Sequence, residues 1–376
     1  MRVTFFINYL NHHQMAVADE MYKLLGDDFR YVATMPRDNR QLKGGEDYSL
    51  RPYCIIATES DDTHRAALEL AESADVCLFG ACSQEYAVHR AVHNPKGLAF
   101  EMGERWLKRG LLNLFSPVLR SWWLNYRRYY RKANFYKLCS GSFVASDDKR
   151  LGCYKGRHFK WGYFTNVPSD YSYAAETSNR ELRLMWCARF IRWKHPEIAI
   201  DCAKRLKDQG YNFRLEMYGD GPIRGNCEEM VKKAELSDKV FLYGNVHNTQ
   251  IRKAMKTSDI FLFTSDRQEG WGVVANEAMA SGCCIVASDR IGAANYLVRN
   301  GYNGYTFPDR DAVSLFKAVK HLIDNPQERI LLSKQAWIDM STIWSPNRAA
   351  LNLLRLIDDL QARNNTSIID GPCSKA

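Results

Sequence analysis

Two carboxylates eight positions apart mark the part of this chain that is richest in residues able to do chemistry. Glu269 lies in a short loop, E-G-W-G, and Glu277 lies in an Ala-rich segment that predicts a helix ending at Gly282. The apolar run at 259–263 before them predicts a buried strand. Glycines allow close approach of a backbone to a ligand, and the first amides of a helix attract anions. The pattern therefore predicts an anion-binding strand–loop–helix with a carboxylate at each end.

An ordinary turn between a strand and a helix, with two surface glutamates, would have the same spacing. However, the run E-G-W-G-V-V-A-N-E-A-M-A-S-G resembles the E-x7-E signature of family 4 glycosyltransferases, which are retaining enzymes with the GT-B fold. This resemblance favours the functional interpretation. The matching positions are Glu269, Gly270, Gly272, Asn276, Glu277, Ala278 and Gly282.

Three upstream elements follow the order of the same family. The run C-A-R-F-I-R-W-K resembles its G-R-L…K-G element, with Ala188 in place of the family's glycine. The run G-D-G-P resembles its G-x-G-P turn, and Y-G-N-V resembles the element that contacts the nucleotide base. Each alone could be a glycine turn or a solvated charge, but together they extend the resemblance over residues 181–307. The matched residues are Arg189, Lys194, Gly219, Gly221, Asn245 and Val246.

The resemblance implies a role for each matched residue. Glu277 would bind the ribose hydroxyls of a nucleotide sugar, more often uridine-linked than guanosine-linked, and Glu269 would contact hydroxyls of the transferred sugar. Arg189 and Lys194 would balance the charge that grows as the bond to the diphosphate breaks. No essential metal or other cofactor is implied. The backbone amides expected at the sugar or the diphosphate are those of Gly270, Trp271 and Gly272.

The amino-terminal half matches the family less well. Its first loop, N-Y-L-N-H-H-Q, lacks the glycine pair that many members have near the donor diphosphate, so His12, His13 or Asn11 could donate there instead. Adjacent loop histidines are also common on plain surfaces. Glu101 and Glu104 follow the fourth-strand region and are acceptor-side candidates, although a glutamate at the start of a helix would be a simpler reading.

Composition gives the broad class of protein. The 376 residues suffice for two domains, and a hydrophobic content of 46% indicates globular cores. The eleven cysteines form no C-x-x-C pair, which suits a reducing cytoplasm. No run of about 18 apolar residues occurs, and the amino terminus is expected to be a strand, not a signal peptide.

The net charge of +9 is concentrated in one block. Residues 105–145 contain nine Lys or Arg, no Asp or Glu, and many aromatic residues. Such a block suits an anionic membrane surface or a nucleic acid, and it could also be a helix whose charges are merely solvated. We expect a peripheral contact with the inner face of a membrane and no nucleic acid. Trp106, Trp122 and Trp123 would lie at the headgroup boundary.

The order of elements predicts an α/β protein with the GT-B fold: two Rossmann-like domains facing across a cleft, and a last helix returning to the first. Two long basic helical segments, broken near Ser116-Pro117, are expected in the first domain. The tail is expected to be frayed. The predicted segments are an acceptor domain at 1–164, a linker at 165–180, a donor domain at 181–342, a returning helix at 343–361 and a flexible tail at 362–376.

The predicted activity is transfer of a sugar from a nucleotide sugar to a lipid-linked or saccharide acceptor in bacterial surface polysaccharide synthesis. Three alternatives remain at this point. A nucleotide-sugar epimerase shares the fold but would need acid and base side chains and no acceptor site. A nucleic-acid-binding protein would leave the two glutamates without a role. A non-catalytic sugar-binding protein would not need the phosphate-binding Arg189 and Lys194.

Overall fold

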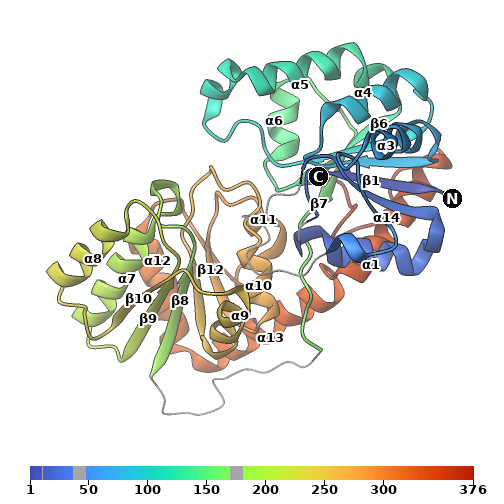
Figure 1. Cartoon of the computed structure of the whole chain (residues 1–376). Helices are drawn as coiled ribbons and strands as arrows, with labels where there is room; N and C mark the ends of the chain where they lie inside the picture. The colour runs from blue at the N-terminus through green and yellow to red at the C-terminus, as the bar shows by residue number, and fades with distance from the viewer. Residues whose placement is uncertain (11, 37–47, 170–180) are drawn as a thin grey trace. The chain divides into compact units, whose positions relative to one another are not determined.

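The computed structural model divides the chain into two compact units, described one at a time (Figure 1). The first contains residues 1–165 and 343–376, and the second contains residues 166–342. The structure describes residues 1–10, 12–36, 48–169 and 181–376. Most of the predicted linker, at 170–180, therefore lies outside the described residues.

The first unit is built on a seven-stranded parallel sheet in the order β3-β2-β1-β4-β5-β6-β7. Its strands are nearly all apolar and buried, as parallel strands covered on both faces must be. The strands are β1 (Val3–Ile7), β2 (Phe29–Ala33), β3 (Cys54–Ile56), β4 (Val76–Phe79), β5 (Leu98–Gly103), β6 (Phe135–Ser140) and β7 (His158–Trp161). The helices are α1 (His12–Leu25), α3 (Asp61–Ser73), α4 (Gln84–His93), α5 (Pro117–Arg128), α6 (Val144–Arg150) and α14 (Pro346–Gln361), and a 3-10 turn, η3 (Gly110–Phe115), precedes α5.

The second unit is built on a six-stranded parallel sheet in the order β10-β9-β8-β11-β12-β13. Its strands are β8 (Leu182–Cys187), β9 (Phe213–Tyr218), β10 (Val240–Gly244), β11 (Ile260–Phe263), β12 (Cys284–Ser288) and β13 (Gly304–Phe307). Its helices are α7 (Pro196–Asp208), α8 (Arg224–Lys233), α9 (Asn248–Thr257), α10 (Val274–Ala280), α11 (Ala294–Leu297), α12 (Ala312–Asp324) and α13 (Pro326–Thr342).

Helices cover both faces of each sheet (Figure 1). In the first unit, α3, α4 and α5 pack on one core, while α1 and α14 pack against each other on the opposite face. In the second unit, α7, α8 and α12 cover one face and α9, α10 and α13 the other. Both sheets reverse their strand order once, between β1 and β4 and between β8 and β11. Ligands of such sheets bind beyond the carboxyl ends of the strands at this reversal.

The prediction for the basic block needs correction. The first expected helical segment, before Ser116-Pro117, is only the 3-10 turn η3, and the second is α5, which ends at Arg128 and is followed by the inner strand β6. This strand was not predicted because it contains Lys137, and a lysine usually indicates a solvent-exposed position. Here Lys137 is fully buried and pairs with Glu101 on β5 at 2.9 Å. The segment at 141–146 leads into the short helix α6, and β2 was not predicted at all.

The prediction of a frayed tail is also wrong. Cys373 and Ser374 are 0% and 1% exposed. The Cys373 amide donates to the Lys160 carbonyl, and the Lys160 amide donates to the Ser374 carbonyl, both at 2.7 Å. Asn352 of α14 donates from its side-chain amide to the Pro372 carbonyl at 2.9 Å. These bonds hold the tail against β7, so the chain's last residues belong to the first unit.

Removal of the tail should therefore destabilise the first unit. Truncation after residue 364 removes these three hydrogen bonds, and at about 1 kcal/mol net each the free energy of unfolding should fall by roughly 3 kcal/mol. Urea denaturation followed by circular dichroism measures this change. The control is Ile369→Ser in the same segment, since Ile369 is 97% exposed. A truncated chain as stable as the full one would contradict the docking.

Candidate functional site

Two loops at the carboxyl edge of the second sheet carry all three predicted catalytic residues. The loop after β8 contains Arg189 and Lys194, and the loop after β11 contains Glu269. Thr264 joins the loops, because it accepts a hydrogen bond from the Trp186 indole at 2.9 Å and donates to the Lys194 carbonyl at 2.7 Å. The loops meet at the reversal of strand order, where a ligand is expected.

Lys194 and Glu269 form a direct ion pair. Their side chains are only 12% and 11% exposed, and the ammonium also lies 4.5 Å from the centroid of the Trp193 ring. Arg189 differs, since its guanidinium is exposed and lies 6.0 Å from the same ring. The structure thus brings one predicted phosphate-binding residue onto the predicted sugar-binding carboxylate.

Gly219 and Gly221 allow the turn after β9 to pack on the loop that carries Arg189. A Cβ on Gly219 would lie 2.0 Å from the Ala188 carbonyl oxygen, and one on Gly221 would lie 2.4 Å from the Phe190 carbonyl oxygen. Both glycines have positive φ, +124° and +158°. Their direct role is close backbone packing against the loop that carries Arg189.

Gly272 and Trp271 shape the loop after β11. Gly272 has φ +91°, and a Cβ there would lie 2.5 Å from the Phe263 ring. Trp271 is fully buried, and its indole donates to the Asn276 side chain at 2.8 Å. The tryptophan side chain therefore holds the loop to α10, and Gly270 between it and Glu269 is buried too.

Glu277 lies in the first turn of α10 and is 8% exposed. The Asn248 side chain at the start of α9 donates to its carboxylate at 3.3 Å, and Arg252 donates to its backbone carbonyl at 2.8 Å. Sequence analysis missed both partners, because neither lies in a recognisable motif. Asn245 is exposed and Val246 is half-buried in the loop after β10.

A second group of charges surrounds His195, which follows Lys194 directly. His195 has φ +50° and contacts Glu197 at 2.6 Å and Asp266 at 3.4 Å. Arg310 donates to Asp266 at 2.8 Å. Burial lowers the pKa of His195, but the two carboxylates outweigh it and the net pKa is raised. Burial raises the pKa of Asp266, but bonds from Gln268, Arg310 and His195 leave it lowered.

The acceptor-side candidates lie in the first unit. His13, Glu101 and Glu104 line a cavity of about 820 Å³ beyond the carboxyl ends of β1, β4 and β5. The side chain of His12 lies outside the described residues. Glu104 contacts Lys108 at 2.7 Å and Tyr163 at 3.0 Å.

Glu101 does not start a helix, as the simpler reading had it, but lies on β5 and is buried. Its carboxylate accepts hydrogen bonds from Trp122 at 2.7 Å, Lys137 at 2.9 Å and Tyr154 at 2.6 Å. Burial lowers the pKa of Lys137, but Glu101 outweighs this and raises it. Glu101 is thus the counter-ion of a buried lysine.

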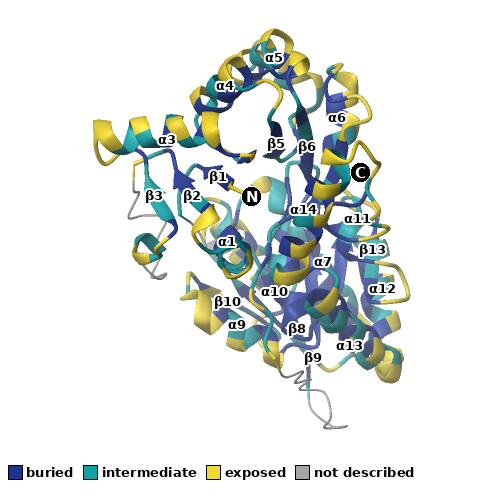
Figure 2. Cartoon of the chain, turned by 90° about the vertical axis from the view of Figure 1, so that its right-hand side faces the viewer, coloured by how far each residue is buried: buried dark blue, intermediate teal, exposed yellow. Residues whose placement is uncertain are grey.

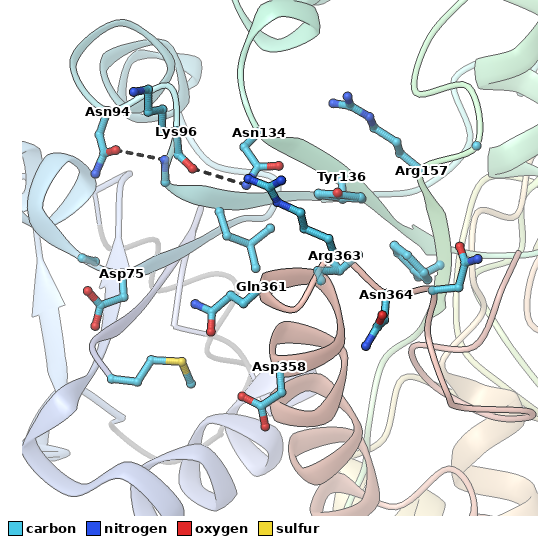
Figure 3. Close-up of a pocket in the computed structure, with 18 of the residues that line it drawn as sticks. Asp75, Asn94, Lys96, Asn134, Tyr136, Arg157, Asp358, Gln361, Arg363 and Asn364 are labelled. Carbon is cyan, nitrogen blue, oxygen red and sulfur yellow. Dashed lines mark hydrogen bonds between the residues drawn. The ribbon is translucent and has the colours of Figure 1, made fainter.

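A larger depression of about 1120 Å³ lies at the amino ends of β4 to β7 (Figure 3). Its walls are polar and include Lys96, Arg157 and Arg363, with Asp75 and Asp358 among them. Asn94 accepts from the Gly97 amide at 2.9 Å and Asn134 donates to the Lys96 carbonyl at 3.3 Å, so these asparagines cap local turns. None of the predicted site residues lies here.

Comparison with known proteins finds a family match that lies within the second unit. The family described as "Glycosyl transferases group 1" matches residues 175–337. The putative colanic acid biosynthesis glycosyltransferase WcaL of Salmonella typhimurium is 29% identical over 139 residues, which is 36% of this chain and 34% of WcaL. The amylovoran biosynthesis glycosyltransferase AmsK of Erwinia amylovora is 26% identical over 187 residues, or 48% and 46% of the two chains. The chain thus spans less than half the length of these curated relatives.

Solved structures resemble the whole chain. HepE of Anabaena, crystallised with UDP, has a TM-score of 0.69 at 15% identity, covering 96% of this chain and all of HepE. The lipopolysaccharide outer core galactosyltransferase WaaB has a TM-score of 0.65 at 14% identity, covering 91% and 99%. These likenesses confirm the predicted GT-B fold.

The charges around His195 predict that the stability of the second unit depends on pH. Because the folded pKa of His195 is raised, its stabilising charge is fully present below the unfolded value of about 6.5 and is lost as pH rises through the folded value. His195→Asn keeps a residue that tolerates positive φ and removes the charge. Urea denaturation of both proteins between pH 5.5 and 8.5 should give a stability difference that shrinks as pH rises. A difference independent of pH would mean that the ring stays neutral.

Proposed function

We propose that this protein is a retaining glycosyltransferase that moves a sugar from a nucleotide sugar, with uridine favoured, to an acceptor hydroxyl. The observation that carries the proposal is the Lys194–Glu269 ion pair between two joined loops, with Glu277 on the helix that follows. This arrangement lies where a doubly wound sheet binds nucleotides. It would supply a carboxylate for a ribose, a carboxylate for a sugar and a cation for a diphosphate.

The ion pair suggests how donor binding prepares the site. In the structure, Lys194 and Glu269 neutralise each other. A diphosphate would attract Lys194, leaving Glu269 to accept hydrogen bonds from the sugar hydroxyls. As the bond between sugar and diphosphate breaks, negative charge grows on the leaving phosphate, and Lys194 and Arg189 stabilise it more than they stabilise the ground state. The acceptor hydroxyl then attacks from the face that the diphosphate leaves and gives up its proton to a diphosphate oxygen.

The nature of the substrates draws on the relatives. WcaL and AmsK are named for the biosynthesis of colanic acid and amylovoran, and HepE has been crystallised with UDP-glucose. A UDP-sugar donor and a lipid-linked or saccharide acceptor of a bacterial surface polysaccharide are consistent with these names. WcaL and AmsK are named as glycosyltransferases, so an epimerase, a nucleic-acid-binding protein or a non-catalytic sugar-binding protein is not favoured.

A peripheral position on the inner face of the membrane forms part of the proposal. Its support is the basic block, in which six cations are exposed, although three of the nine are paired with acids outside the block. Near an anionic leaflet each exposed cation contributes about 1 kcal/mol. Within the described ranges, no helix has the length and apolar character needed to cross a bilayer.

The two glutamates should fail in different ways. Glu277→Ala should weaken UDP binding by roughly 1.5–3 kcal/mol, because a charged hydrogen-bond acceptor for the ribose is lost. Glu269→Ala should bind UDP almost normally and lose turnover, since its partner is the sugar. Isothermal titration with UDP and a UDP-release assay separate the two effects. Wild-type turnover in both variants would rule out this site assignment.

The two cations should act mainly on the chemical step. Arg189→Ala and Lys194→Ala should each lower kcat by about 100-fold or more, because the charge they stabilise develops in the transition state. Lys194→Arg should rescue only in part, since a planar guanidinium does not replace a compact ammonium. Arg183→Ala is a matched control on β8, outside the phosphate loop. An unchanged kcat with a raised KM would show that these residues bind only the ground state.

A further inference from the structure

Large apolar side chains are exposed in an unusual concentration on the segment 111–124 of the first unit. Figure 2 marks exposed residues along α5, the helix of this segment. Most of these apolar side chains are largely exposed to solvent: Leu111 is 71% exposed and Phe115 is 73% exposed. We call this segment the ridge. The exposed apolar side chains of the ridge are Leu111, Leu112, Leu114, Phe115, Val118 and Leu124.

These side chains are not needed for the local fold. The ridge is fixed by Ser116, which caps α5, by Pro117 at its first position, and by Leu119, Trp122 and Tyr126, which face the core. Asn113 accepts a hydrogen bond from the Arg109 amide at 2.6 Å and fixes the turn before the helix. The helix would form with polar residues at its exposed positions, so their apolar character indicates a second contact surface.

Exposed cations flank the ridge. Arg105, Lys108 and Lys137 are neutralised by Asp147, Glu104 and Glu101. The other six cations of the block are exposed, and none has a carboxylate partner among the described residues. An apolar surface bordered by unpaired cations complements an anionic bilayer, whose headgroups attract the cations while the acyl region accepts the apolar side chains. The six are Arg109, Arg120, Arg127, Arg128, Arg131 and Lys132.

The ridge also forms the rim of the 820 Å³ cavity. Asn113, Ser116 and Val118 belong to both. Two residues that line the cavity, Ser140 and Gln14, each have a buried side-chain oxygen with no hydrogen-bond partner within the described part of the chain. Such buried oxygens on residues that line the cavity would be satisfied by water or by a ligand with hydroxyl groups, such as a sugar.

We propose that the ridge inserts its apolar side chains into the surface of an anionic bilayer and thereby places the mouth of this cavity at the lipid headgroups. This inference rests on the proposed function and specifies how the acceptor is reached: a glycolipid would keep its lipid in the bilayer and put its sugar into the cavity. The contact differs from the one predicted from sequence. Trp122 is only 3% exposed and packs inward, so leucines and a phenylalanine make the apolar contact.

The experiment is co-sedimentation of the full chain with vesicles of neutral lipid, or of neutral lipid with a quarter anionic lipid. Wild type should bind the anionic vesicles and keep part of its binding in 1 M salt, where the Debye length is about 3 Å and insertion alone remains. The triple variant Leu111→Ser, Leu112→Ser, Phe115→Ser should bind at least tenfold more weakly and lose all binding in high salt. Arg127→Glu with Arg128→Glu should lose only the part of binding that salt screens.

Controls separate this inference from the proposed function. Leu331→Ser is the matched variant, because Leu331 is 67% exposed on α13 of the second unit, and it should bind vesicles like wild type. UDP binding should be unchanged in every variant. A triple variant that binds vesicles like wild type would overturn the inference, as would a lipid-free wild-type dimer that the triple variant converts to monomer. If the wild-type chain did not bind UDP, that result would count against the proposed function and not against the membrane contact.

Discussion

The second unit depends on one contact, in which the Thr264 hydroxyl links the loop after β8 to the loop after β11. Parallel strands deliver their following loops to the same edge, but only a bond between the loops fixes the relative positions of their side chains. Thr264 is fully buried and bonds to both Trp186 and Lys194, so it couples the core of the sheet to the loop after β8. The pairing of Lys194 with Glu269 follows from that coupling.

Sequence patterns anticipated the second unit closely, because its chemistry follows strand ends. Apolar runs at 182–187 and 260–263 fixed the strands, and the polar residues after each run had to lie at one edge. The sequence did not predict which side chains pair when they lie far apart along the chain. The bond between Asn248 and Glu277 joins two helices through a residue outside any motif.

The first unit was harder to predict because it buries charge. Lys137 on β6 and Glu101 on β5 stabilise each other, so a lysine that normally signals a surface lies in the core. The same pairing changes the meaning of the basic block. A count of nine cations suggested a uniformly positive face. Three of them form ion pairs with carboxylates of the first unit, and the other six are exposed to solvent beside apolar side chains. Net charge alone does not separate these two populations.

The return of the chain to the first unit affects the order in which the protein can fold during synthesis. The second unit is complete once residue 342 has been made, although it lies in the middle of the sequence. The first unit begins earlier but lacks α14 and the segment that bonds to Lys160 until residues 343–376 have been made. Domains usually fold from the amino terminus onward. Here the second unit can complete its folding first. The sheet of the first unit keeps the face that α14 covers exposed to solvent until α14 has been made.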